Sequence, residues 1–280
     1  MVWKHKRGEL NLSRRGAIMG ILNVTPDSFS DGGSFSSGDE AVAHALLMEK
    51  SGADIIDVGG ESTRPGAAAV SEAEELCRVI PVIRNLRAQS EVLISVDTSK
   101  AAVAKEAVLA GADIINDVTA LRGDSAMPEV ALHSGAGLVL MHMQGRPRTM
   151  QDNPRYLDVV GEVAKFLRQA LASALECGMS AERIALDPGI GFGKMPAHNL
   201  ALLQSLEAFA PLQRPLLIGV SRKSFLASLA DSPAIADRFW PAVALTSYCR
   251  EHGARIFRVH EPQPHHEALR MTEAILNSSS

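Results

Sequence analysis

Eight short apolar runs, spread over almost the whole chain, constrain the fold more than any other feature of the sequence. They are continuous rather than alternating and are rich in Ile, Leu and Val, which is typical of strands buried on both faces of a parallel sheet. The runs are Ala17–Val24, Asp54–Gly59, Val92–Asp97, Asp113–Val118, Gly137–Met143, Arg183–Asp187, Pro215–Val220 and Arg255–His260. Segments with helical spacing lie between them, for example Glu40–Lys50, Lys100–Leu109, Leu157–Glu176 and Pro241–Glu251. The alternation predicts an α/β fold.

A local pattern repeats where a predicted helix gives way to the next strand. Ser51-Gly-Ala-Asp-Ile-Ile-Asp-Val58 is echoed by Ala110-Gly-Ala-Asp-Ile-Ile-Asn-Asp-Val118. In both, the glycine can adopt the left-handed conformation that ends a helix. Repeated βα units form either a doubly wound sheet or a closed (β/α)8 barrel. Eight strands in a chain of 280 residues favour the barrel, a single TIM-barrel domain over residues 17–276 with residues 1–16 as an extension packed on it.

Composition and charge exclude several classes of protein. The net charge of −4 argues against a general nucleic-acid binder, and no apolar run approaches the ~18 residues that a membrane span needs. Residues 1–16 are polar and basic, so no secretory signal peptide is expected. The cysteines, Cys77, Cys177 and Cys249, are far apart and odd in number, which predicts free, buried thiols. We therefore expect a cytoplasmic protein.

Polar or ionisable residues follow every predicted strand. In a barrel, functional groups gather where the carboxyl ends of the strands meet. A lone acid at a strand end is more often a helix cap, but eight such ends at one mouth are hard to explain as caps alone. These residues are Asn23, Asp57, Asp97, Asn116, His142, Asp187, Ser221 to Lys223, and Arg258 with His260. They predict an active site at this mouth.

Three loops at the predicted mouth are unusual. Residues 25–39 are rich in Ser and Gly, residues 59–66 carry Arg64, and glycine recurs at 189, 191 and 193 after Asp187. Long polar loops in a compact domain are commonly functional lids. The first two loops are predicted to close over the mouth.

The side chains at the mouth divide into two chemical sets. Asp97, Asn116 and Asp187 combine acceptors with an amide and suit a flat, nitrogen-rich heterocycle. The second set carries cations and donors suited to a phosphate or pyrophosphate: Asn23, Arg64, Arg258, His260 and Lys223. Asn23 can also give Mg²⁺ a neutral oxygen ligand. A Schiff-base role for Lys223 is a lesser alternative, and the pair His265–His266 is predicted to be solvated rather than metal-binding.

The motifs that carry these residues resemble those of the dihydropteroate synthase family, in order and over nearly the whole domain. They are Met19-Gly-Ile-Leu-Asn-Val-Thr-Pro-Asp-Ser-Phe-Ser-Asp-Gly-Gly33, Ile56-Asp-Val-Gly-Gly-Glu-Ser-Thr-Arg-Pro-Gly66, Ile94-Ser-Val-Asp-Thr98, Ile115-Asn-Asp117, Leu140-Met-His-Met143, Leu186-Asp-Pro-Gly189 and Ser221-Arg-Lys-Ser224. The resemblance implies a (β/α)8 barrel that condenses 6-hydroxymethyl-7,8-dihydropterin pyrophosphate with p-aminobenzoate. The products are 7,8-dihydropteroate and pyrophosphate, in folate biosynthesis.

The resemblance also implies a role for each matched residue. The pterin would be held by Asp97, Asn116, Asp187 and Lys223. Pyrophosphate would meet Asn23, Thr63, Arg258 and His260, with Mg²⁺ on Asn23. p-Aminobenzoate would contact Arg64, Pro65, Phe192 and Ser221. The residues expected to be catalytic are Asp97, Asp187, Lys223, Arg258 and His260.

Three further expectations come from the resemblance. Pyrophosphate is a good leaving group and the pterin ring can stabilise the cationic carbon that remains, so the substitution is expected to be dissociative and SN1-like, with an arylamine nucleophile that needs no strong base. The loop after Asp187 lacks the Phe-Gly insertion of sulfonamide-resistant relatives, which predicts sensitivity to sulfonamides as competitive inhibitors. The family also suggests a homodimer through outer helices. Two alternatives stay open, a methyltetrahydrofolate-binding methyltransferase barrel and a non-catalytic pterin-binding homologue.

Overall fold

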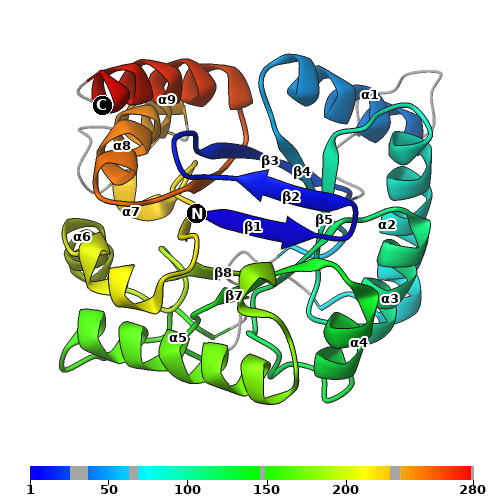
Figure 1. Ribbon diagram of the computed structural model, residues 1–280, viewed down its shortest axis with the longest axis horizontal. Coiled ribbons are helices and arrows are strands. Elements are labelled where there is room, and N and C mark those ends of the chain that lie inside the picture. The colour runs from blue at the N-terminus through cyan, green and yellow to red at the C-terminus, as the bar shows by residue number, and fades with distance from the viewer. Residues whose placement is uncertain (26–36, 63–68, 146–148, 228–233, 235, 279–280) are drawn as a thin grey trace.

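The protein folds into a closed barrel of parallel strands with helices on its outside. The computed structural model describes residues 1–25, 37–62, 69–145, 149–227, 234 and 236–278 (Figure 1). Eight strands pair in the order β8-β7-β6-β5-β4-β3-β10-β9. A parallel bridge between Leu186 and Leu216 joins the two outer strands and closes the cylinder. The predicted barrel is therefore confirmed, and the doubly wound alternative was wrong.

Each predicted strand forms at its predicted place. The strands are β3 (Ala17–Asn23), β4 (Ile55–Gly59), β5 (Leu93–Asp97), β6 (Ile114–Asp117), β7 (Gly137–Met141), β8 (Ile184–Asp187), β9 (Leu217–Ile218) and β10 (Ile256–Val259). The apolar runs were continuous because both faces are covered. Alternate side chains such as Ile56 and Val58 face the helices, whereas Ile55 faces the barrel interior.

The α-helices of the described chain pack around the barrel. They are α1 (Ser37–Lys50), α2 (Glu72–Arg87), α3 (Ala101–Ala110), α4 (Met127–Ser134), α5 (Val159–Glu176), α6 (Pro196–Gln204), α7 (Ser224–Ala227), α8 (Phe239–Glu251) and α9 (Pro262–Asn277). The repeated glycines after α1 and α3 take positive φ, +96° at Gly52 and +122° at Gly111, as the repeat predicted. Among the described residues, no helix is long and apolar enough to cross a membrane.

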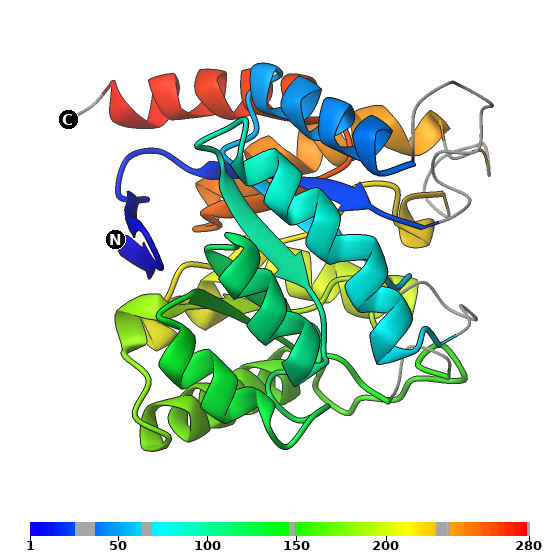
Figure 2. The ribbon, with the colours of Figure 1, turned by 90° about the vertical axis from the view of Figure 1, so that its right-hand side faces the viewer.

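A hairpin that the sequence did not predict covers the amino end of the barrel. Strands β1 (Val2–His5) and β2 (Gly8–Asn11) pair antiparallel, and in Figure 2 the barrel strands point away from them. Trp3 is fully buried against the lowest layer of the barrel interior and donates to the carbonyl of Arg183 at 2.9 Å. The extension therefore plugs the base. The division of the chain at residue 17 stays a prediction.

A buried carboxylate ties this hairpin to the barrel. Asp113, which is fully buried, accepts from Arg7 Nε at 2.6 Å and from Arg87 Nη2 at 2.7 Å. It also accepts from the amide of Ile94 at 2.9 Å. Two cations and an amide thus satisfy both oxygens of one carboxylate.

Two predictions about single residues were wrong. His265 is fully buried rather than solvated, because it lies on the inner face of α9 and pairs through Nδ1 with Thr246 Oγ1 at 2.7 Å. Burial lowers the pKa of His265 to about 4. Of the three free cysteines only Cys249 is buried, whereas Cys77 on α2 and Cys177, directly after α5, are exposed.

Candidate active site

The barrel interior changes from apolar to polar along the strands. Because side chains alternate, residues two apart face the same side. The lower interior layer consists of Ala17, Met19, Ile55, Ile114, Val139, Ala185, Leu217 and Ile256. Two residues further on, four of these strands carry Asp57, Asn116, Asp187 and Arg258. One end of the barrel is therefore an apolar base and the other a polar floor, the arrangement typical of a barrel enzyme.

Strand register brings three of the predicted site residues to one level. Asn23 pairs with Gly59, Gly59 with Asp97, and Asp97 with Asn116. Neighbouring strands thus present an amide, a carboxylate and a second amide side by side.

A network of charges links the floor across the barrel. Arg258 donates through Nε to Asp57 Oδ2 and through Nη2 to Asp97 Oδ2, both at 2.6 Å. Asn116 Nδ2 donates to the same oxygen of Asp57 at 3.0 Å. The other oxygen of Asp57, Oδ1, is buried and has no hydrogen-bond partner among the described residues. We refer to Asp57, Asp97, Asn116 and Arg258 as the floor network.

Burial shifts the pKa values of the acids on the floor. Desolvation raises the pKa of Asp97 to about 7, opposed by Arg258 and reinforced by the negative charge of Asp57. Desolvation also raises the pKa of Asp187 to about 6, while the amide of Gly189 and the cation of Lys223 oppose it. Burial lowers the pKa of Arg258, but Asp57 and Asp97 outweigh that effect and raise it overall. Near neutral pH, Asp97 and Asp187 are therefore expected to be fully ionised only when further hydrogen-bond donors reach them.

Glycine is required in the loop after Asp187. Gly189, Gly191 and Gly193 all have positive φ, at +68°, +82° and +61°. A Cβ on Gly189 would lie 1.9 Å from the carbonyl oxygen of His142, which no side chain can tolerate. The amide of Gly189 donates to Asp187 Oδ1 at 2.6 Å. The glycine pattern therefore places a backbone donor on the acid of the floor.

Side chains from outside the loop hold its carbonyl groups. Lys194 is buried, and its Nζ donates to the carbonyls of Gly189 at 2.9 Å and Phe192 at 3.0 Å. The same Nζ contacts Nδ1 of His142 at 2.9 Å. Gln151 donates to the carbonyl of Gly191 at 2.7 Å, and Tyr156 to that of Gly193 at 2.8 Å.

Burial favours the neutral forms of Lys194 and His142. It lowers the pKa of Lys194 to about 7 and, together with the Lys194 cation, that of His142 to about 3. His142 contacts the lysine that donates to the loop carbonyls, and it therefore helps to hold the loop in place. Sequence reasoning gave neither Lys194 nor Gln151 nor Tyr156 a role, because a support for a backbone carbonyl has no motif.

Two more predicted residues meet at the edge of the floor. Lys223 Nζ lies over the Phe192 ring, 4.0 Å from its centre, a cation–π contact. Phe192 in turn packs in an apolar cluster with Val118, Met141, Met143 and Met150. Ser221 Oγ contacts His260 Nδ1 at 3.0 Å, so the residues predicted for the two substrates touch each other.

The structure thus brings nine of the twelve predicted site residues to one mouth: Asn23, Asp97, Asn116, Asp187, Phe192, Ser221, Lys223, Arg258 and His260. Thr63, Arg64 and Pro65 lie outside the described residues, as does most of the loop after Asn23. Asp57 is the residue whose importance was underestimated, since its position at a strand end was noted but its partners were not predictable.

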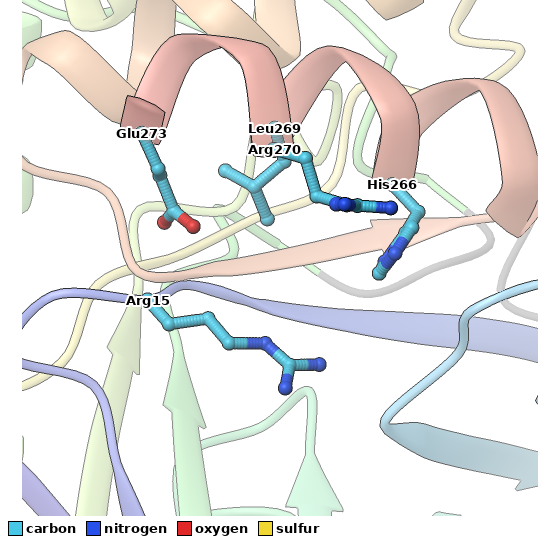
Figure 3. Close-up of a pocket in the computed structure, with 5 residues that line it drawn as sticks. All are labelled: Arg15, His266, Leu269, Arg270 and Glu273. Atoms are coloured by element: carbon cyan, nitrogen blue, oxygen red, sulfur yellow. The ribbon is translucent and has the colours of Figure 1, made fainter. Parts of the chain in front are cut away.

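A hollow elsewhere on the surface has a different character. It has a volume of about 290 Å³ and is lined by Arg15, His266, Leu269, Arg270 and Glu273 (Figure 3). Arg15 precedes β3, so this hollow lies at the amino end of the barrel. Its lining includes no predicted site residue. The polar floor, rather than this hollow, is therefore the candidate active site.

Comparisons with known proteins show the family of the chain. Residues 19–260 match the family described as "Pterin binding enzyme". The chain is 48% identical to the dihydropteroate synthase of Escherichia coli strain K12, with 93% of this chain and 92% of the relative covered. It is similar to the crystal structure of Yersinia pestis dihydropteroate synthase with a sulfonamide drug (TM-score 0.92, 44% identity, 99% and 100% covered). It is also similar to the Xanthomonas albilineans enzyme with 4-aminobenzoic acid (TM-score 0.90, 43% identity, 96% of each chain) and with 7,8-dihydropteroate (TM-score 0.87, 40% identity, 96% of each chain).

Proposed function

The chain belongs to the pterin-binding enzyme family and, within it, to the dihydropteroate synthases, and we infer the following reaction for it. It is a transferase that joins 6-hydroxymethyl-7,8-dihydropterin pyrophosphate to p-aminobenzoate, giving 7,8-dihydropteroate and pyrophosphate in folate biosynthesis. The observation that carries this proposal is the polar floor, where two buried carboxylates and an amide converge on one inward face. That set matches the donor-rich edge of an aminopyrimidine.

The pterin occupies the floor in this proposal. Asp187 and Asp97 accept N–H bonds from the heterocycle, and Asn116 both donates and accepts. Their raised pKa values support this assignment, because burial disfavours their ionised forms and further N–H donors from the substrate would favour those forms again. Lys223, next to the Phe192 ring, reaches the pterin ring from the rim.

Pyrophosphate lies above the floor, at the side of β3 and β10. Arg258 lies near the carboxyl end of β10, His260 directly follows that strand, and Asn23 ends β3, which pairs with β10. No group of three or more His, Cys, Asp or Glu side chains in the described part of the chain is arranged to hold a metal. A single amide oxygen on Asn23 fits a Mg²⁺ ion whose other ligands are water and substrate phosphates. When bound, Mg²⁺ would supply charge neutralisation for the leaving pyrophosphate. Thr63 would add a hydroxyl donor.

p-Aminobenzoate approaches over the rim. Phe192 is held in its apolar cluster and offers a wall for the ring, and Ser221 offers a hydroxyl. Arg64 and Pro65 would complete the site from the second loop. The amine then lies on the open side of the pterin methylene carbon.

The mechanism follows from these positions. The bond between the methylene carbon and the pyrophosphate oxygen breaks first, and its electron pair leaves with pyrophosphate. Arg258 and His260 stabilise the developing negative charge, while the pterin ring stabilises the cationic carbon. The arylamine nitrogen then forms the new bond and loses its proton to solvent. Exclusion of water protects the cation from hydrolysis.

One assay tests the function. Protein, Mg²⁺ and dihydropterin pyrophosphate are mixed with and without p-aminobenzoate, and pyrophosphate release is followed. The proposal requires release that depends on p-aminobenzoate and yields 7,8-dihydropteroate. Equal release without the arylamine would indicate a hydrolase. For the order of bond changes, clean inversion at an isotopically chiral methylene without a cation-like isotope effect would count against the dissociative path.

Sulfonamides should compete with p-aminobenzoate. The loop between Asp187 and Lys194 lacks a Phe-Gly insertion beside Phe192, so no inserted side chain would block the drug from the p-aminobenzoate site. Added sulfonamide is expected to raise KM for p-aminobenzoate and leave kcat unchanged. A fall in kcat at constant KM would contradict a shared site.

The outer helices support a homodimer. Trp240 and Tyr248 are exposed on α8, and Met271 and Ile275 are exposed on the neighbouring α9. A group of large apolar side chains on adjacent helices is typical of a covered face. Sedimentation of the protein should give a dimer, and Met271→Glu with Ile275→Lys should give a monomer.

The free thiols are compatible with the cytoplasm, which we propose as the location of the protein.

A further inference from the structure

The carboxylate of Asp57 occupies the centre of the floor network. It is fully buried, it comes from β4, and it accepts bonds from Arg258 on β10 and Asn116 on β6. Both bonds end on one oxygen, Oδ2. A single atom therefore fixes the positions of two residues that belong to the proposed substrate site.

The two carboxylates that share Arg258 differ in their surroundings. Asp97 is slightly exposed toward the mouth, at 7%, whereas Asp57 is fully enclosed. Substrate N–H groups can therefore reach Asp97 but not Asp57. Arg258 occupies Oδ2 of Asp97 through Nη2 and Oδ2 of Asp57 through Nε, so a pterin that takes Oδ2 of Asp97 would compete with the first bond and leave the second in place.

We propose that Asp57 is a positioning residue of the reaction, which keeps Arg258 and Asn116 in place while Asp97 exchanges its bond with Arg258 for bonds to the pterin. This inference rests on the proposed function. Of the two carboxylates that pair with Arg258, only Asp97 would remain if Asp57 were removed. A guanidinium that is only 16% exposed cannot lose its last counter-charge cheaply, so Asp97 would stay engaged and the pterin would lose its acceptor.

The electrostatics of Asp97 supply a readout that a merely structural role would not move. The charged groups that act on Asp97 are Arg258 on β10, Asp57 on β4, Glu75 on α2 and Asp117 on β6. Asp57 raises the pKa of Asp97 and Arg258 lowers it. Removal of the Asp57 charge therefore lowers the pKa of Asp97 and moves the acid limb of pterin binding to lower pH.

The test compares Asp57→Asn with Asp113→Asn. Both replace a fully buried aspartate that is paired with arginine, but Asp113 lies at the opposite end of the barrel. For Asp57→Asn, kcat/KM for dihydropterin pyrophosphate is expected to fall roughly 100-fold, the effect of misplacing a positioned group by about 1 Å. The acid limb of its pH profile is expected to move to lower pH. Asp113→Asn is expected to keep the wild-type profile in its folded fraction.

The outcomes separate this inference from the proposed function. A wild type without p-aminobenzoate-dependent pyrophosphate release would refute the function itself. A functional wild type with a folded Asp57→Asn variant that keeps its kcat/KM and its acid limb would overturn the positioning role.

A second pair of variants covers the case in which Asp57→Asn does not fold. Arg258→Met removes the largely buried cation, so Asp57→Asn/Arg258→Met contains no guanidinium without a counter-charge. In that pair Asp57 acts only through Asn116. Binding of dihydropterin pyrophosphate, measured by calorimetry with Mg²⁺, should be about tenfold weaker in the double variant than in Arg258→Met, the effect of about 1.4 kcal/mol. Equal affinity would overturn the proposal.

Discussion

The two ends of the barrel both contain a buried aspartate–arginine cluster, but the two clusters are built in opposite ways. At the amino end one carboxylate, Asp113, lies between Arg7 and Arg87, and both of its oxygens accept. At the carboxyl end one guanidinium, Arg258, lies between Asp57 and Asp97. The first cluster is complete in the free protein, whereas the second has more acceptors than donors.

This difference separates a structural cluster from a binding cluster. A buried acceptor without a donor costs free energy, and natural structures keep such groups mainly where function needs them. Asp97 is the member of the floor network that the mouth can supply with donors, because its side chain is slightly exposed there, and burial raises its pKa to about 7. The substrate proposed here is rich in N–H donors. We infer that the carboxyl end is completed by its ligand, while the amino end is completed by the hairpin.

Removal of a residue from the proposed pterin site is expected to give the largest effect on activity. Asp187→Asn replaces one acceptor by a donor, and Lys223→Ala removes the cation beside Phe192. Each should lower kcat/KM by about 10²- to 10³-fold, the usual effect of losing one preorganised polar contact. Steady-state pyrophosphate release measures it. Activity within a few-fold of wild type in either variant would refute the site assignment.

The same chemical change at the amino end should affect stability instead. Asp113→Asn removes the fully buried carboxylate that the partly exposed Arg7 and Arg87 share. The free energy of unfolding should fall by about 3–5 kcal/mol, as when one partner of a buried ion pair is removed. Urea unfolding gives this value, and kcat/KM per folded molecule should stay at the wild-type level. A specific loss of kcat/KM would mean that the two ends are not independent.

The glycine loop offers a smaller effect. Lys194→Met removes the donor that holds the carbonyls of Gly189 and Phe192, and the position of the Phe192 ring then becomes less defined. KM for p-aminobenzoate should rise about tenfold, with KM for dihydropterin pyrophosphate within about twofold of wild type. Lys165→Met on the exposed face of α5 is the matched control and should change neither. An equal rise in both constants would indicate general loosening rather than an effect on the rim.

Much of the barrel could be predicted from the sequence, because strands covered on both faces leave continuous apolar runs. The polar floor was predictable for the same reason, since residues such as Asp187 and Arg258 interrupt those runs two positions after an inward apolar residue. Few folds other than the barrel accommodate eight such strands with helices between them.

The rest depends on contacts that exist only in the folded chain. The sequence of the hairpin is mostly polar. Its main apolar residue, Trp3, packs against residues of the barrel base that are distant in the sequence, so no local pattern predicts the hairpin. Asp57 and Arg258 are 201 positions apart, so nothing local marks them as a pair. Gln151 and Tyr156 come from an irregular segment and act on backbone carbonyls, which any sequence provides.

Proton release on pterin binding tests the central claim, that the ligand completes the carboxyl end, most directly. In the free protein Asp97 has a pKa of about 7 and Asp187 of about 6, so both carry protons part of the time near pH 6.5. Binding to N–H donors favours their ionised forms and lowers both pKa values.

The measurement is calorimetric titration of 6-hydroxymethyl-7,8-dihydropterin, which lacks phosphate, in buffers of different ionisation enthalpy. We predict net proton release near pH 6.5, a smaller release in Asp97→Asn, and none near pH 9, where both acids are already ionised. Binding without proton exchange at pH 6.5, or with proton uptake, would contradict the account.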